Sequence, residues 1–205
     1  MAKLLLVSFL VVLPMAGLAQ STATAPPDFT VSTGKVVPNP STDSKVDLIF
    51  EGGHETVGAD RGRPVILIAA ALGVPDDVFR QAFTKVKPAP AGQQPDPAQV
   101  ILNKQNLMRS LGPYGVTDDR LNTVSNYYRY RRSSGEMWRN TPAAAYATLQ
   151  NGSVTAITIT KAGSGYSSPP KVSVSGLPGV HLAASVAYGT KLEENGSIKE
   201  IKVVP

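Results

Sequence analysis

The spacing of apolar residues changes once along this chain of 205 residues, from helical in the middle to alternate near the C-terminus. Between residues 64 and 128, apolar side chains recur roughly every three or four positions, which is typical of helices that bury one face. From residue 151 onward they alternate with Thr, Ser and Lys, which is typical of half-buried strands. A run of helices followed by a run of strands predicts an α+β fold.

Capping residues predict four helices in the middle segment. PVILIAAAL begins at Pro64 and is followed by Gly73, and PDD then places carboxylates at the start of a second helix. A third helix opens at Pro97, and Thr117 can cap a fourth. ALGVPDDVF resembles PYGVTDDRL at a shift of about 42 residues, so we expect two helix-turn-helix-like units.

Four alternating segments predict a small antiparallel β module over residues 151–205. The tripeptide NGS occurs at Asn151 and again at Asn195, about 44 residues later, and we expect each copy to form a turn that starts an equivalent strand. The side chains expected to be buried together are those of Ile157, Ile159, Ile201 and Val203. Those expected to face the other way are Thr158, Thr160, Lys202 and Val204.

The segment ITITKAGSGYSSPPKVSVSG, residues 157–176, resembles the Gly-Ser-Gly-Tyr β repeat of bacteriophage tail and virion proteins and of bacterial surface proteins. The chain departs from this repeat at Ala162, where another Gly is common, and carries one copy and part of a second. The resemblance implies a noncatalytic β module of structural or adhesive type. The helical part, with VSNYYRY, looks like uncharacterised secreted bacterial proteins that carry the same module. The matching positions are Ile157, Ile159, Gly163, Ser164, Gly165, Tyr166, Pro169, Val172, Val174 and Gly176.

The first twenty residues predict export to the periplasm or the medium. MAKLLLVSFLVVLPMAGLAQ has a basic Lys3, an apolar run over residues 4–13, and small residues at Gly17 and Ala19, which is the order of a secretory signal peptide. We expect no membrane span after its removal. The expected organisation is a signal peptide over residues 1–19, a Ser/Thr/Pro-rich lead-in over 20–45, a mainly helical domain over 46–140, a linker over 141–150, and the β module.

Composition narrows the classes of partner. The formal net charge is +5, and removal of Lys3 with the signal peptide leaves +4, a mildly basic balance that favours acidic partners without requiring them. The absence of Cys excludes a disulfide framework and thiolate metal sites. We expect an acidic envelope polymer or another envelope protein as partner, and no nucleic acid. The oligomeric state is not indicated.

Aromatic and arginine side chains are interleaved in SNYYRYRRSSGEMWRN, residues 125–140. Aromatic faces can stack on sugar rings, and guanidinium groups bind carboxylate or phosphate, so this segment is a candidate binding site for an acidic polymer. The alternative is ordinary packing between the helical and β regions. The candidate residues are Tyr127, Tyr128, Arg129, Tyr130, Arg131, Arg132, Trp138 and Arg139.

The sequence contains no recognisable catalytic constellation, metal-ligand spacing or cofactor motif. His54, together with Glu51, Glu55 and Asp60 in EGGHETVGAD, could hold a hard cation or supply a base. His181 stands far from it in the sequence. We therefore predict a nonenzymatic structural or binding protein of the bacterial cell envelope.

Two other functions remain open. The first is a small secreted enzyme or enzyme inhibitor that uses the His54 loop. The second, more remote, is helix-turn-helix DNA binding, but Asp76 and Asp77 stand where a recognition helix would meet phosphates, and the signal peptide points away from DNA.

Overall fold

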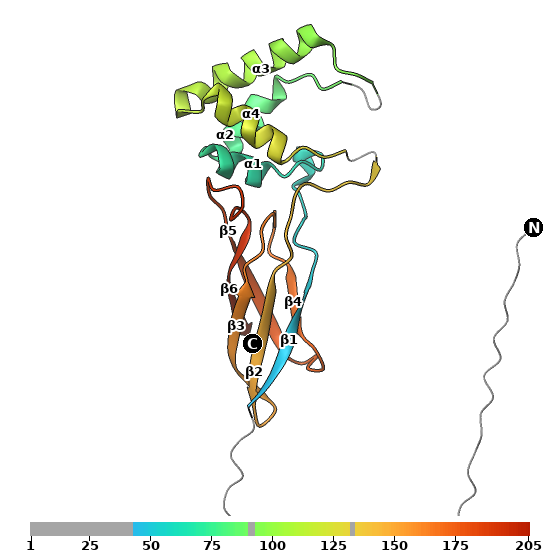
Figure 1. Ribbon diagram of the computed structural model, residues 1–205, viewed down its shortest axis with the longest axis vertical. Coiled ribbons are helices and arrows are strands. Elements are labelled where there is room, and N and C mark those ends of the chain that lie inside the picture. Colours follow the sequence, from blue (N-terminus) through green and yellow to red (C-terminus); the bar gives the residue numbers. More distant parts are fainter. Residues whose placement is uncertain (1–42, 90–92, 132–133) are drawn as a thin grey trace, which may run out of the picture. The chain divides into compact units, whose positions relative to one another are not determined.

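A computed structural model of the chain describes residues 43–89, 93–131 and 134–205, and the predicted signal peptide and most of the lead-in lie outside this part. The described part has four α-helices and a six-stranded antiparallel sheet, which confirms the α+β prediction (Figure 1). The helices are α1 (Val65–Leu72), α2 (Asp76–Thr84), α3 (Pro97–Leu111) and α4 (Asp118–Tyr127), with 3-10 helices η1 (Gly58–Asp60) and η2 (Gly112–Tyr114). The strands are β1 (Ser44–Glu51), β2 (Ala144–Gln150), β3 (Ser153–Lys161), β4 (Lys171–Val174), β5 (His181–Ala187) and β6 (Ser197–Val204).

The helix ends follow the predicted capping chemistry. α1 ends at Gly73, whose φ of 73° is left-handed and therefore favours glycine. The Asp96 side chain accepts from Ala98 N at 3.0 Å at the start of α3. Thr117 does the same for α4, where its hydroxyl accepts from Arg120 N at 3.2 Å.

The helices pack around an apolar core to which each of them contributes. α1 packs against α2 and α4, and α2 packs against α3. The two similar segments of the sequence take equivalent positions at the starts of α2 and α4, since Phe79 and Leu121 are both buried, as are Val74 and Val116. Their grouping into two helix-turn-helix units stays a prediction.

The sheet has the strand order β3-β2-β1-β4-β5-β6, in which β1 pairs with both β2 and β4. β4, β5 and β6 form a meander, whereas all four helices lie between β1 and β2 in the sequence. This order corrects two expected boundaries. Residues 141–150 are not only a linker, because they contain β2, in which Ala145, Ala147 and Leu149 are buried on one face. β1, which was assigned to the helical domain, is a central strand of the sheet and buries Leu48.

Both NGS copies start an outer strand with the same irregularity. β3 and β6 each begin at the Ser of NGS. The register against the neighbouring strand then skips one residue, Thr155 in β3 and Lys199 in β6, which marks a β-bulge at the same place in both copies. Each NGS copy therefore starts an equivalent strand, as the sequence predicted, and the structure adds that both strands carry a bulge at the same position.

The bulge changes which residues of β6 face the core. Ile198 and Ile201 are both buried, three positions apart, because Lys199 is the extra residue between them. Ile157 and Ile159 are half-buried against the same core cluster, as expected. The expectation for Val203 is wrong: it is 54 % exposed, because it lies near the end of an outer strand that only β5 borders.

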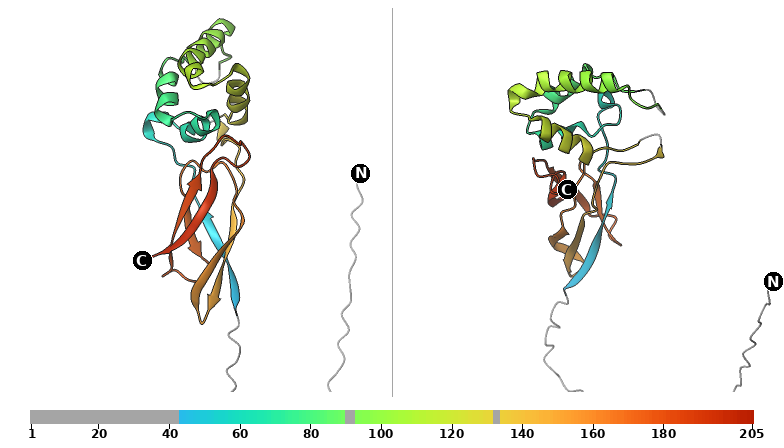
Figure 2. Two further views of the ribbon diagram at one scale, coloured as in Figure 1. Left: turned by 90° about the vertical axis from the view of Figure 1, so that its left-hand side faces the viewer. Right: turned by 45° about the horizontal axis from the view of Figure 1, so that its top comes forward.

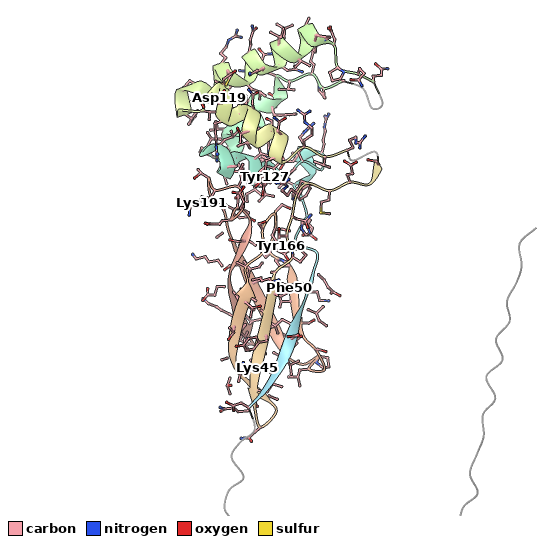
Figure 3. All side chains as sticks on the ribbon, viewed as in Figure 1. Lys45, Phe50, Asp119, Tyr127, Tyr166 and Lys191 are labelled. Carbon is pink, nitrogen blue, oxygen red and sulfur yellow. The ribbon has the colours of Figure 1, made fainter. Side chains whose placement is uncertain are left out.

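The helices gather at one end of the sheet, and both views of Figure 2 show this arrangement. Arg120 of α4 joins the two parts, because its guanidinium donates both to Ala71 O in α1 and to Thr190 O in the β5–β6 connection. The Gly-Ser-Gly-Tyr segment lies at the same end, where Figure 3 labels Tyr166. Tyr166 is buried, and its hydroxyl accepts from Ala143 N at 3.0 Å.

Candidate functional site

The structure brings together the two segments that the sequence marked separately, the His54 loop and the aromatic-arginine segment. His54 follows β1, and its ring stacks on Tyr166 with ring centroids 5.2 Å apart. The same imidazole lies 6.0 Å from the ring of Trp138. The His54 loop and the aromatic-arginine segment therefore form one candidate site, at the junction of helices and sheet.

Trp138 forms the fixed wall of this site. Its side chain is buried, and Nε1 donates to Gly165 O at 2.8 Å. The ring of Tyr130 meets it edge-on at 5.6 Å, and the Tyr130 hydroxyl donates to Gly62 O. The indole is held on several sides and does not offer a free face for stacking on a ligand.

Tyr128 is equally committed to packing. It is 3 % exposed, and its hydroxyl oxygen accepts from Asn195 Nδ2 at 2.8 Å. Burial raises the pKa of Tyr128 to about 12. The expectation that Tyr128 and Trp138 present aromatic faces to a polymer is therefore wrong, and the packing alternative holds for both.

Two arginines of the segment are engaged within the protein. Arg131 pairs with Glu136, with Nη2 and Oε1 3.1 Å apart, and its backbone N donates to Glu136 Oε2 at 2.9 Å. The Arg139 guanidinium lies 4.9 Å from the ring centroid of the half-buried Tyr127. Arg129 is exposed, and Arg132 lies outside the described residues. The predicted basic surface is thus only partly present.

A groove of about 430 Å³ opens beside Trp138. We call it the junction groove; its lining residues are His54, Glu55, Thr56, Gly62, Tyr130, Gly135, Glu136, Met137 and Trp138. Met137 brings an apolar side chain that is 50 % exposed. No Lys or Arg is present among these described lining residues.

Both carboxylates of the junction groove favour the ionised form. A hydrogen bond from Ser168 to Glu55 is the main cause that lowers the pKa of Glu55. The Arg131 backbone N–H is the main cause that lowers the pKa of Glu136, and the Arg131 charge adds to it. The groove lining therefore carries two ionised carboxylates, and Arg131 pairs with that of Glu136.

His54 is poorly placed to act as a base. Desolvation by burial lowers its pKa, although a hydrogen bond with the Gly52 backbone and the charge of Glu55 act in the opposite direction. Its Nε2 atom is buried and has no hydrogen-bond partner among the described residues. A substrate would have to displace the packed rings before it could reach this nitrogen.

Glu51, His54, Glu55 and Asp60, which by their residue types could hold a hard cation, do not gather into one group. Asp60 is buried and binds Arg80, with Arg80 Nε and Asp60 Oδ1 2.6 Å apart. Glu51 faces Lys171 across the β1–β4 pair, at 3.9 Å. In the part of the chain that the structure describes, no three His, Asp or Glu side chains gather as a metal site would require.

Sequence reasoning missed two residues that shape the junction. Asn195 was read only as a turn residue, yet it is 1 % exposed and binds groups from three other segments. Glu136 stood unnoticed between Gly135 and Met137, although a carboxylate five positions after Arg131 is a signal for a local ion pair.

Comparisons with protein-family models, with curated proteins and with solved structures give no match for this chain. Over residues 43–89, 93–131 and 134–205, none of the helices has the length and apolar character needed to cross a membrane.

Proposed function

We propose that this chain is an exported, nonenzymatic binding protein of the bacterial cell envelope, which holds another envelope protein in the junction groove. The observation that carries the proposal is the groove itself: about 430 Å³ beside an indole fixed by burial and by a hydrogen bond to Gly165 O. A wall that is already ordered loses little conformational entropy on binding.

The chemistry of the groove favours a protein segment over an acidic polymer. Met137 and Tyr130 offer apolar and aromatic contact, and Glu55 and Glu136 offer ionised carboxylates. An exposed loop with a basic and an apolar side chain would complement both features. An acidic polymer would meet repulsion in the groove, so Arg129 and Arg139, outside it, would have to supply that contact.

The Gly-Ser-Gly-Tyr resemblance supports a noncatalytic role. Gly163 and Gly165 both have positive φ, and their Cα atoms approach the backbone of residues 139–143 so closely that a Cβ would lie within 3 Å of it. The motif thus serves to fasten the β module to the segment that carries Trp138. Export rests on the first twenty residues, and N-terminal sequencing from the native host should find a mature chain that begins at Gln20.

The alternative of an enzyme or inhibitor depends on His54 and Glu55. Replacing both together by Ala and Gln would abolish any such activity in the secreted material. If that double variant loses no activity, the enzyme or inhibitor alternative is rejected.

A photo-crosslinking amino acid at position 137 tests the binding function directly. In the native host, we expect crosslinks from position 137 to one envelope protein. The matched control is position 49, because Ile49 is 47 % exposed and Met137 50 %, but Ile49 lies on β1, away from the groove. Equal crosslinking from both positions, or crosslinks only to polysaccharide, would overturn the proposal.

A further inference from the structure

Another cavity is lined by residues 59–65, which include part of η1 and the start of α1, and by residues 80–88, which include the end of α2. It has a volume of about 250 Å³, and three arginines line it: Arg61, Arg63 and Arg80. Asp60 is the one acidic residue of this lining, and it is 4 % exposed.

The Asp60 carboxylate is already occupied by Arg80. The guanidinium Nε donates to Oδ1 at 2.6 Å and Nη2 donates to Oδ2 at 3.1 Å, a two-pronged contact. Arg63 uses the backbone instead, because its Nη1 donates to Asp60 O at 3.1 Å. The charge of Arg63 is therefore not paired by that carboxylate, although the two residues touch.

Arg80 has two carboxylate partners, because Asp76 Oδ2 also lies 3.4 Å from its Nη2. Arg63 makes no salt bridge among the described residues, so its charge is the one that an anion in the cavity would meet. Desolvation by burial is the main cause that lowers the pKa of Arg63, and the charge of Arg61 lowers it further, whereas Tyr130 and Asp60 act in the opposite direction. A bound anion would compensate the two effects that lower this pKa.

Apart from Thr84, the remaining lining residues are apolar. Val65 is buried beneath the cavity, and Phe83 and Val86 close it on the α2 side, with the Arg63 guanidinium 4.2 Å from the Phe83 ring centroid. Its volume lies just below the range of about 300–1,000 Å³ typical for drug-sized ligands, so one small group would fill it.

We propose that this cavity binds a small organic anion, with a carboxylate or phosphate group against Arg63 and an apolar body of about one ring against Phe83. The forked guanidinium matches the two oxygens of either anion, and the half-buried setting limits screening by salt. This inference goes beyond the proposed function, because the cavity and the junction groove share no lining residue.

The test uses the purified protein and four probes in titrations followed by NMR and calorimetry. Benzoate and phenyl phosphate should bind saturably, with shifts confined to residues 59–65 and 80–88, and their relative affinities decide between carboxylate and phosphate. Neutral benzamide and inorganic phosphate should bind at least tenfold more weakly. If benzamide binds as well as benzoate, the cavity is merely apolar; if inorganic phosphate binds as well as phenyl phosphate, it is a counterion site; either result overturns the proposal.

Variants assign the site to Arg63. Arg63→Gln should lower the affinity for the tighter-binding probe at least tenfold. Arg63→Lys keeps the charge but not the forked guanidinium, so its affinity should lie between those of the wild type and Arg63→Gln. Arg129→Gln removes the same charge from an exposed position outside the cavity and should leave the affinity unchanged. Equal losses in Arg63→Gln and Arg129→Gln would reject the site. These probes are tested without any envelope partner. If they fail to bind, the proposal for the junction groove is not affected. If crosslinking at position 137 fails, the proposal for this cavity is not affected.

Discussion

The side-chain amide of Asn195 donates to the backbone oxygen of Leu67 at 2.7 Å, across 128 positions of sequence. The same amide donates to the hydroxyl of Tyr128 at 2.8 Å, and Oδ1 accepts from Gly189 N at 3.1 Å. One side chain before β6 therefore holds α1, the end of α4 and the β5–β6 connection together.

Replacing Asn195 by Gly should lower the free energy of unfolding by about 3 kcal/mol, because it leaves several buried polar groups without partners. The matched control is Asn151→Gly in the other NGS copy. Asn151 has a φ of 51° in an exposed two-residue turn, which glycine tolerates, so we expect a change below about 0.5 kcal/mol. Denaturant unfolding measures both values, and equal losses would contradict this role for Asn195.

Trp138 should matter for stability through both its hydrogen bond and its volume. Trp138→Phe removes the Nε1–Gly165 contact and should cost about 1–2 kcal/mol, while Trp138→Ala should cost about 3–5 kcal/mol. Arg129→Gln, at an exposed position, should stay within about 0.5 kcal/mol of the wild type. Thermal and denaturant unfolding check this order. A stable Trp138→Ala protein with lost binding would instead favour a direct role in recognition.

Gly165 should be intolerant of a side chain for steric reasons beyond its positive φ. A Cβ there would lie 2.7 Å from Arg139 O, whereas Gly176, with a φ of 75°, has nothing within 4 Å. Gly176→Ala should cost about 1–2 kcal/mol from backbone strain alone. Gly165→Ala should cost at least about 2 kcal/mol more, because the backbone of residues 139–140 must move. Similar costs for the two variants would show that the close approach is unimportant.

Stability should fall as the pH drops below about 6.5, the ordinary pKa of histidine. Burial lowers the pKa of His54 in the folded protein, so the unfolded chain binds the proton first and is favoured as the pH falls toward the folded-state value. Above 6.5 this effect is absent. His54→Gln should therefore make the unfolding free energy less dependent on pH between about pH 7 and 5. An unchanged slope in His54→Gln would contradict this account.

The sequence predicted local features well and long-range pairing poorly. The four helix starts were readable because Pro64, the carboxylates of PDD, Pro97 and Thr117 act on their own backbone neighbours. β2 was missed because its buried positions are mostly Ala, which gives a weak alternation signal. The central place of β1 was not readable either, since its partners β2 and β4 lie about 100 residues away in the sequence.

The residues of the candidate site could be predicted from the sequence, but their contacts could not, because these contacts are also long-range. The residue types at His54 and at 127–139 stood out, but only the fold shows that Trp138 and His54 touch. Burial shows that the aromatic rings of Tyr128 and Trp138 pack in the protein and do not face a ligand. The sequence could not show this, because a pattern of Tyr and Arg is the same whether the rings face solvent or a core. Asn195 lacked any local signal, because all its side-chain partners except Gly189 are far away in sequence.

The bulges in the outer strands β3 and β6 also affect the tendency of this protein to aggregate with its own copies. A regular edge strand offers an unbroken row of backbone donors and acceptors to any passing strand, and that row is the template for edge-to-edge aggregation. Thr155 and Lys199 each interrupt the row near the start of their strand, and Lys199 adds a charge. At both borders of the sheet, the repeated phrase therefore places a bulge that disfavours pairing with a strand of another copy.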